Sequence, residues 1–319
     1  MKTAECVSPK HPDKICDLIA DTLLDTYLKE DKNSRCAIEV MGGHNLIMLN
    51  GEVTSKSKVD VKKIVKKLVG PNFKIITNLQ EQSIKIGEAV DSGGAGDQGI
   101  MIGYACSEND EMVPQEYYLA RDLCNFVYKQ FPYDGKTQIT LNYKNEVEKV
   151  VISFQNTNIQ DLMYCLNSWT KQNKISFSKT NSFFLNPAGY WNQGGFDADT
   201  GLSGRKIVID NYGPEIPIGG GSFSGKDYTK VDRSGAYMAR KIAVDYLKKY
   251  NAKEIYTKLA YAIGKTEPVM AVVTVDGKEM KIKDYDLSPH GIYKHLKLNK
   301  VKFSQTSNWG HFGRGFSWD

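Results

Sequence analysis

Several features that would assign this chain to a specialised class of protein are missing. It has six cysteines in 319 residues, without a C-x-x-C pair or a cysteine–histidine cluster at metal-ligand spacing, which argues against a zinc site or a disulfide framework. The N-terminal segment contains no apolar stretch of signal-peptide type, and no run of about 18 apolar residues occurs. We therefore expect reduced, mostly buried thiols and a cytoplasmic protein without a membrane span.

The excess of positive charge is also small. The chain has 42 lysines and arginines against 37 aspartates and glutamates, a net charge of +5, and 41% of its residues are hydrophobic. This composition is typical of a globular protein and tolerates anionic small molecules. A basic face interleaved with aromatic residues, which single-stranded nucleic acid would require, is not found. We expect no nucleic-acid partner, and we interpret the lysines at 56–67 as the solvated face of a helix.

A helix–strand–strand–helix order occurs three times along the chain. The apolar periodicity predicts a helix from residue 12, strands at 35–41 and 45–53 and a helix at 59–68; then a helix at 115–129, strands at 137–143 and 147–154 and a helix at 159–169; then a helix at 233–249, strands at 255–263 and 267–275 and a helix at 289–296. Glycine-rich junctions at 91–99 and 194–204 separate these units. We expect domains at 1–92, 93–193 and 194–319. The fold class is α/β of the α+β type, with three similar domains in an internal pseudo-threefold repeat, mixed sheets containing hairpins, and helices on one face.

The segment 219–233, GGGSFSGKDYTKVDR, nearly matches a P-loop. Its glycines and Lys226 have the required spacing, so backbone N–H groups and an ammonium group could hold phosphates. The next residue, however, is Asp227 instead of the magnesium-binding serine or threonine, and no clear buried strand leads into the glycines. Lys230 and Asp232 add a further cation and carboxylate, which suits a magnesium polyphosphate. A solvated loop that caps a helix starting near residue 232 explains the segment equally well.

Four other loops combine glycine or proline with charged residues. They are HPDK at 11–14, GGAGDQG at 93–99, DGK at 134–136, and the segment 197–206, in which Arg205 and Lys206 precede a predicted apolar strand at 207–209. Each is also explained by ordinary helix-start or turn chemistry. Taken with 219–233, they favour a single type of ligand, a metal polyphosphate.

These motifs resemble those of the S-adenosylmethionine synthetase (methionine adenosyltransferase) family over essentially the whole chain. The match rests on HPDK, GAGDQG, DGK, FFLNPAG at 183–189, GLSGRK at 201–206 and GGGSFSGKDYTKVDRS at 219–234. The resemblance implies synthesis of S-adenosyl-L-methionine from ATP and L-methionine. The sulfur would attack C5′ of ATP in line, and the tripolyphosphate would then be hydrolysed to phosphate and diphosphate. It also implies a homodimer with active sites at the interface, or a homotetramer.

The resemblance further assigns a role to individual residues. The catalytic residues would be His11, Lys136, Arg205, Lys226 and Lys230. ATP would be bound by His11, Asp97, Asp134, Gly135, Lys136, Tyr190, Trp191, Asp199, Arg205, Lys206, Ser222 and Lys226; Trp191 would stack on the adenosine, although packing in the core is an alternative. Methionine would be bound by Glu52, Gln82, Asp199 and Lys230. Two Mg²⁺ ions per site would be held by Asp13 and Asp232, and K⁺ by Glu39.

Two other interpretations remain open at this point. A P-loop phosphotransferase is disfavoured by Asp227 and by the missing strand. A non-catalytic relative that kept the fold is disfavoured because the charged positions are retained. The chain also departs from the family between residues 82 and 94, where the loop is several residues shorter and Lys85 stands at a usually acidic position.

Overall fold

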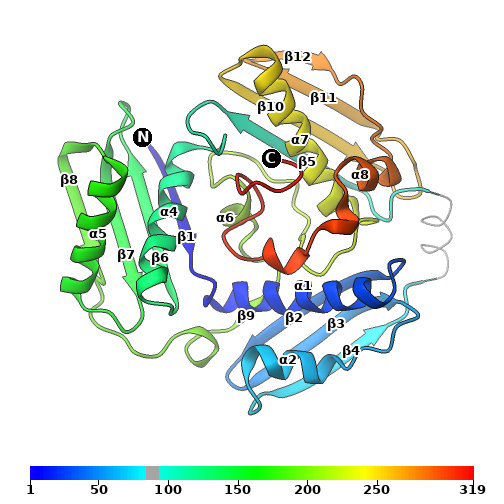
Figure 1. The fold of residues 1–319 in the computed structure, drawn as a ribbon, viewed down its shortest axis with the longest axis horizontal. Helices are drawn as coiled ribbons and strands as arrows, with labels where there is room; N and C mark the ends of the chain where they lie inside the picture. Colours follow the sequence, from blue (N-terminus) through cyan, green and yellow to red (C-terminus); the bar gives the residue numbers. More distant parts are fainter. Residues whose placement is uncertain (84–92) are drawn as a thin grey trace.

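Three four-stranded sheets make up the framework of the protein. The structure is a computed structural model and describes residues 1–83 and 93–319; the shortened loop with Lys85 therefore lies almost entirely outside the described residues. In the first sheet the strand order is β9 (Gly201–Leu202), β2 (Arg35–Gly43), β3 (Leu46–Thr54), β4 (Lys74–Gln80). In the second sheet it is β1 (Lys2–Val7), β6 (Gly135–Leu141), β7 (Val147–Phe154), β8 (Phe177–Leu185). In the third sheet it is β5 (Gly99–Cys106), β10 (Glu254–Tyr261), β11 (Met270–Val275), β12 (Lys278–Lys281). Figure 1 shows the three sheets around the centre of the molecule.

The sheets share one plan, which confirms the predicted fold class. Each contains an antiparallel hairpin, β2–β3, β6–β7 or β10–β11. In the first two sheets the chain then crosses over through α2 (Val61–Val69) or α5 (Ile159–Asn173), and β4 and β8 join in parallel. In the third sheet β12 follows β11 directly and pairs antiparallel with it. Asp276 and Gly277 make that tight turn, with φ of 45° and 83°. The helix predicted at 289–296 is α8 (Pro289–His295). It follows the last strand of its sheet, β12, whereas α2 and α5 precede the last strands of their sheets.

Each sheet also takes one edge strand from a distant part of the sequence. β1 pairs with β6, β5 pairs with β10, and the short β9 pairs with β2. None of these three strands was predicted. The domain limits at 92/93 and 193/194 stay a prediction, and the sheets exchange strands across both of them.

The long helices α1 (Pro12–Glu30), α4 (Gln115–Gln130) and α7 (Val231–Tyr250) cover the inner faces of the sheets. α1 packs on β2 and β9, α4 on β1 and β6, and α7 on β5 and β10. One large core joins the first and third sheets, and a separate core lies under the second, around Trp169. All six cysteines are buried and unpaired, as expected.

The outer face of the sheet β2–β3–β4 is not covered by any described element. Side chains alternate along these strands, and those that point outward include Met41 and Met48, 49% and 42% exposed, together with Ile76. Glu39 and Asn50, paired across β2 and β3, are exposed on the same face. An apolar sheet face of this kind usually marks an interaction surface.

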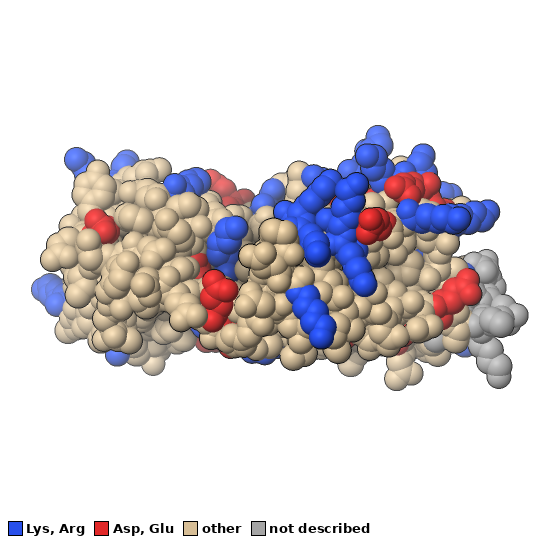
Figure 2. Space-filling view, turned by 90° about the horizontal axis from the view of Figure 1, so that it is seen from below, with Lys and Arg blue, Asp and Glu red and all other residues tan. Residues whose placement is uncertain are grey.

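The lysines of α2 form a solvated helix face, as the sequence predicted, whereas Lys56 and Lys58 lie before the helix. Val65 is fully buried, whereas Lys62, Lys63, Lys66 and Lys67 are exposed. Figure 2, which views the molecule from the side on which α2 lies, shows lysine and arginine side chains gathered on this surface. No helix in the described part of the chain is both long and apolar enough to cross a membrane.

One predicted element is wrong. Residues 207–209 are not a strand but the start of the short helix α6 (Ile207–Asn211). A run of three apolar residues has no period that separates a helix from a strand. Here Ile209 is buried and Val208 is 39% exposed.

Candidate active site

The first group of predicted site residues gathers at the start of α1. Pro12 occupies the first helical position, and the His11 side chain caps the helix by accepting the backbone N–H of Asp13 at 3.2 Å. The Asp13 carboxylate is fully buried. Its Oδ1 accepts the backbone N–H of Leu202 at 2.8 Å, and its Oδ2 lies 2.5 Å from Lys206 Nζ. The Nε atom of Arg205 lies 3.4 Å from Asp13 Oδ1. The GLSGRK loop therefore brings two predicted phosphate-binding cations onto one predicted magnesium ligand.

The environment of His11 keeps its imidazole neutral. Burial, together with the positive charges of Lys206 and Lys136, lowers the pKa of His11 to about 4, although Asp13 and Asp199 oppose the shift. Since Nδ1 accepts the Asp13 N–H, the ring proton is assigned to Nε2. His11 thus presents an N–H donor at a position surrounded by cations.

The loop before β6 supplies Asp134, Gly135 and Lys136. Asp134 is buried, and burial raises its pKa against the opposing hydrogen bonds from the backbone of Gly195 and Gly135 and the charge of Lys136. Its Oδ2 accepts the Gly195 N–H at 2.9 Å. Lys136 also acts electrostatically on His11, so this loop belongs to the same cluster as the start of α1.

Trp191 and Tyr190 lie on the loop beside Asp134. The carbonyl of Trp191 accepts the backbone N–H of Asn156, and the preceding residue, Gln155, is hydrogen-bonded to the Asp134 backbone at 2.9 Å. Trp191 is only half-buried and its indole N–H is 3.4 Å from Asn186 Oδ1, while Tyr190 is 65% exposed. Neither ring is part of a hydrophobic core. The alternative that Trp191 packs in the core is therefore disfavoured, and stacking on the adenosine stays a prediction.

The second group of predicted residues lies in the loop that precedes α7. Lys226 Nζ is 2.7 Å from Asp232 Oδ2, so a predicted phosphate-binding cation is again paired with a predicted magnesium ligand. Gly225 has φ of +80°, and a Cβ there would lie 2.0 Å from the carbonyl oxygen of Ile38. A Cβ on Gly221 would lie 2.1 Å from Asp232 Oδ1. The glycines are therefore required because the loop passes directly over β2 and over the Asp232 carboxylate.

Asp227, the residue that breaks the P-loop pattern, is a structural anchor. Its fully buried carboxylate accepts the backbone N–H groups of Cys36 at 2.7 Å and Thr229 at 2.9 Å. Asp227 also pairs with Lys230 at 2.7 Å, and the Lys230 side chain is 7% exposed. The segment before the glycines contains α6 and no strand. Both observations exclude a P-loop.

Two contacts join the second group to its neighbours. A Cβ on Gly204, next to Arg205, would lie 2.5 Å from Ser222 Oγ, which places the GLSGRK and GGGSFSG loops against each other. The GAGDQG loop is held by the Gly96 N–H, which donates to the Thr229 carbonyl at 3.1 Å. Asp97 in this loop accepts the N–H of Gln98 at 2.8 Å.

Four aspartates on α1 form a ladder that was not predicted from the sequence, and each of them holds another segment. Asp13, Asp17, Asp21 and Asp25 follow one another at intervals of four residues and lie on one side of the helix. They accept backbone N–H groups of Leu202, Gly204, Gly225, and of both Phe303 and Ser304, respectively, at 2.8–2.9 Å. Two of these segments carry the predicted phosphate-binding cations. The constant spacing was visible in the sequence, where only the apolar face of this helix was considered.

The residues predicted to bind methionine are not gathered in this chain. Glu52 on β3 is the register partner of Gln80, and the Gln82 N–H donates to Thr54 Oγ1 at the end of the same strands. No hydrogen bond or ion pair of the described residues connects this pair to Asp199 or to Lys230. Gln82 Oε1 and Thr229 Oγ1 are buried without a hydrogen-bond partner within the described chain. Thr229 lines a polar cavity of about 610 Å³ with Thr54, Gly93 and Gly94. Thr229 is a candidate binding residue that the sequence did not indicate.

The donor set suits magnesium bound together with a phosphate ligand. No group of three or more His, Cys, Asp or Glu side chains that could hold a metal ion by itself occurs among the described residues. Magnesium usually takes one or two carboxylates, with phosphate and water oxygens completing its shell. Asp13 and Asp232 each supply one carboxylate beside predicted phosphate-binding cations, so the residues fit Mg²⁺ held in this way. Glu39 offers one exposed carboxylate.

Fold and site together define a three-sheet α/β protein in which predicted phosphate-binding cations and predicted metal carboxylates meet on loops beside the sheets. Three family models match consecutive segments: S-adenosylmethionine synthetase, N-terminal domain, at 1–89; its central domain at 92–191; and its C-terminal domain at 193–319. The chain is similar to an S-adenosylmethionine synthase of Mycoplasmopsis pulmonis, 40% identical over 98% of this chain and 93% of the relative. It is also similar to those of Parvibaculum lavamentivorans, 36% identical over 99% and 95%, and of Borreliella afzelii, 36% identical over 99% and 94%.

The chain therefore belongs to the S-adenosylmethionine synthetase family. It is an enzyme of the methionine adenosyltransferase type. The resemblance, the fold class and the enzyme class predicted from the sequence are confirmed. The roles of individual residues stay predictions.

Proposed function

We propose that this enzyme makes S-adenosyl-L-methionine by in-line attack of the methionine sulfur on C5′ of ATP. A sulfur lone pair forms the new S–C5′ bond, while the C5′–O bond breaks and its electron pair leaves with the triphosphate. The released tripolyphosphate is then hydrolysed to phosphate and diphosphate. A thioether already has a free lone pair, so the reaction needs no general base. The main requirement is stabilisation of the leaving group.

The observation that carries this proposal is the pairing of predicted metal carboxylates with predicted phosphate cations. Asp13 contacts Lys206 and Arg205, and Asp232 contacts Lys226. Each pair holds an ammonium or guanidinium group in place while its charge is balanced. A triphosphate would supply oxygen acceptors for these cations, together with Lys136 and Lys230. Two magnesium ions held by Asp13 and Asp232, and a potassium ion held by Glu39, would neutralise negative charge on the leaving group.

His11 would act at the C5′ end of the triphosphate. Its neutral imidazole carries the proton on Nε2, from which it can donate a hydrogen bond to an oxygen that becomes more negative as the C5′–O bond breaks. Asp97, Asp134, Gly135, Tyr190, Trp191, Asp199 and Ser222 would place ATP. Trp191, on the loop beside Asp134, would stack on the adenine.

A homodimer would complete the site. Glu52 and Gln82, proposed to bind methionine together with Asp199 and Lys230, lie beside the uncovered sheet face with Met41 and Met48. A second copy of the chain bound to that face would bury the Met41 and Met48 side chains. It would also bring Glu52 of one chain toward the first group of site residues, at the start of α1, in its partner. We propose a cytoplasmic homodimer with interface active sites, or a homotetramer built from it.

An assay with ATP, methionine, Mg²⁺ and K⁺ tests the reaction directly. S-adenosylmethionine, phosphate and diphosphate should appear in equal amounts. Release of tripolyphosphate without the sulfonium product, or the absence of turnover, would refute the proposed chemistry. Omission of K⁺ should lower the rate, and a Glu39→Gln variant should respond less to K⁺ than the parent enzyme.

A further inference from the structure

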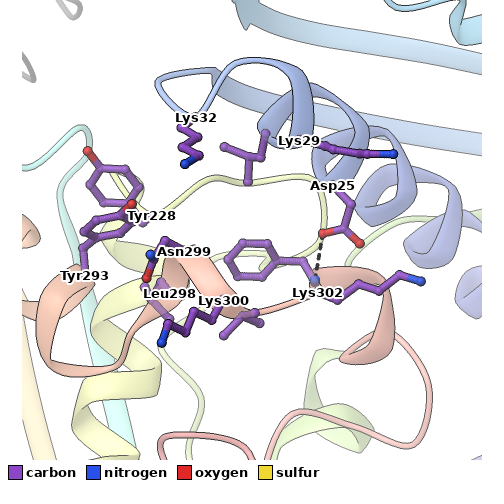
Figure 3. Close-up of a pocket in the computed structure, with 12 residues that line it drawn as sticks. Asp25, Lys29, Lys32, Tyr228, Tyr293, Leu298, Asn299, Lys300 and Lys302 are labelled. Atoms are coloured by element: carbon purple, nitrogen blue, oxygen red, sulfur yellow. Dashed lines mark hydrogen bonds between the residues drawn. The ribbon is translucent and has the colours of Figure 1, made fainter.

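A cavity of about 320 Å³ lies between the C-terminal half of α1 and the segment after α8, and none of its lining residues is among those assigned to the reaction. It is lined by Asp25, Leu28, Lys29, Lys32, Tyr228, Tyr293, Leu298, Asn299, Lys300, Val301, Lys302 and Phe303. The last six belong to the stretch that contains the short helices η2 (Leu298–Lys300) and η3 (Phe303–Gln305). Figure 3 shows these side chains around the opening. Its volume is at the small end of the range for ligand pockets.

The charge around this cavity is strongly unbalanced. Four lysines, Lys29, Lys32, Lys300 and Lys302, stand against one carboxylate, Asp25. Both Asp25 oxygens are already occupied, since Oδ1 accepts the Phe303 N–H at 2.8 Å and Oδ2 accepts the Ser304 N–H at 2.9 Å. The ion pairs formed by the described residues include none of the four lysines. An anion is therefore the ligand that complements this cavity.

The walls of the cavity are aromatic and apolar on one side. The rings of Tyr228 and Tyr293 pack against each other, with centroids 4.3 Å apart and an interplanar angle of 36°. Phe303 and Leu298 are buried behind the opening. In Figure 3, Lys32 and Lys300 lie at the end of the cavity where the two tyrosines are, whereas Lys29 and Lys302 extend from the other end. Tyr293 also lies nearly parallel to His290, with ring centroids 6.2 Å apart and an interplanar angle of 18°. A planar ring against the tyrosine surface that lines the cavity would have Lys32 and Lys300 at the same end of the cavity (Figure 3).

We propose that this cavity binds a nucleoside monophosphate, with the base against Tyr228 and Tyr293 and the phosphate on Lys32 and Lys300. Aromatic side chains stack on every base, and lysine ammonium groups bind phosphate as point charges. The limited volume favours one phosphate and one base over a dinucleotide. This site is separate from the proposed reaction, and its occupancy does not depend on that proposal. Tyr228 follows the anchor Asp227 and precedes Lys230 by two residues, so the ligand would contact the loop that carries Lys226.

Calorimetric titration of the full-length protein with AMP tests the site, with adenosine and inorganic phosphate as separate probes. The double variant Lys32→Gln/Lys300→Gln should weaken AMP binding about ten-fold, the effect of removing charge-assisted hydrogen bonds to a phosphate. The matched variant Lys29→Gln/Lys302→Gln removes the same charge at the other end and should change affinity less than about three-fold. Tyr293→Leu should weaken the binding of AMP without affecting that of phosphate.

Several outcomes would overturn this assignment. Equal losses in both double variants would mean diffuse electrostatic attraction. Binding that persists in Lys32→Gln/Lys300→Gln but disappears in Lys226→Gln would place AMP in the proposed active site. Phosphate that binds as tightly as AMP would exclude recognition of the base. The lysines at positions 29, 32, 300 and 302 are exposed, whereas Tyr293 and Lys226 are half-buried. Circular dichroism should verify that each variant is folded. Normal S-adenosylmethionine synthesis without AMP binding would refute this site alone.

Discussion

Replacing Asp21 by asparagine tests whether the aspartate ladder holds the site together through buried charge. Asp21 is fully buried and forms a bidentate pair with Arg233, with Nη1–Oδ1 and Nη2–Oδ2 distances of 2.7 and 2.8 Å. Asp21 Oδ1 also accepts the N–H of Gly225 at 2.9 Å. Asparagine keeps one acceptor but loses the charge, and its amide N–H group faces a guanidinium that has only donors.

The expected loss is large because the partner stays behind as an unpaired buried cation. Removing one member of a buried pair destabilises a protein by about 3–5 kcal/mol, against a total stability of about 5–15 kcal/mol. Asp25→Asn is the matched control, since Asp25 is the next aspartate on the same side of α1, four residues after Asp21. Asp25 is half-buried and accepts two backbone N–H groups, without an ion pair among the described residues. We expect Asp25→Asn to lower stability by about 1 kcal/mol.

Urea denaturation followed by circular dichroism measures both variants. Similar small losses for Asp21→Asn and Asp25→Asn would refute the argument from buried charge. The double variant Asp21→Asn/Arg233→Met removes the stranded cation and should recover more than half of the lost stability. If the double variant is less stable than Asp21→Asn, the hydrogen bonds of Arg233 to Thr306 and to the Lys226 carbonyl outweigh its charge.

Three further predictions follow from the site and the sheet face. Because the folded-state pKa of His11 is about 4, below the ordinary 6.5, the unfolded chain binds this proton more readily between those values, and stability falls as the pH drops through them. The stability advantage of the parent over His11→Gln in urea should therefore shrink by about 3 kcal/mol between pH 7 and pH 4, and a constant difference would contradict the assigned pKa. Lys226→Ala should retain its circular dichroism spectrum but lose about 10²-fold or more in kcat, since it removes the proposed contact to the leaving group; unfolding of this variant would show a structural role instead. Met48→Lys on the uncovered sheet face should shift the protein from dimer to monomer in sedimentation experiments, whereas a monomeric parent protein would refute the proposed interface.

Local patterns predicted most of the fold, and long-range pairing explains what they missed. The helices from Pro12 and from Gln115 and the central hairpins begin within a few residues of their predicted positions, because each has its own apolar period and its own start or turn residues. The last strand of each sheet, β4, β8 or β12, was not predicted, and the edge strands β1, β5 and β9 were missed as well. Their partners lie far along the chain, and the two residues of β9 are too few to carry any period.

The candidate site, like the fold, could be predicted where the signal is local and not where it depends on long-range contacts. Glycines and charged residues in one loop indicated a phosphate ligand, and the structure places Lys206 on Asp13 and Lys226 on Asp232. The pairing of each cation with its carboxylate could not be predicted from any single loop. Lys206 and Asp13, for example, are separated by about 190 residues of sequence. Lys230 shows both cases. Its ion pair with Asp227, three residues away, could have been predicted from the sequence, whereas the anchoring of Asp227 to Cys36 on β2 could not.

The exchange of edge strands determines the order in which the chain can fold during synthesis. β1 leaves the ribosome before every other described strand, yet its partner β6 begins only at Gly135. The sheet that contains β2 and β3 stays open at one edge until Gly201 and Leu202 have been made. Nascent chains of intermediate length therefore expose unpaired strand edges, which are the surfaces on which incomplete chains associate. We therefore expect this enzyme to complete its folding late in translation, and we expect stalled or truncated chains to be its most aggregation-prone forms.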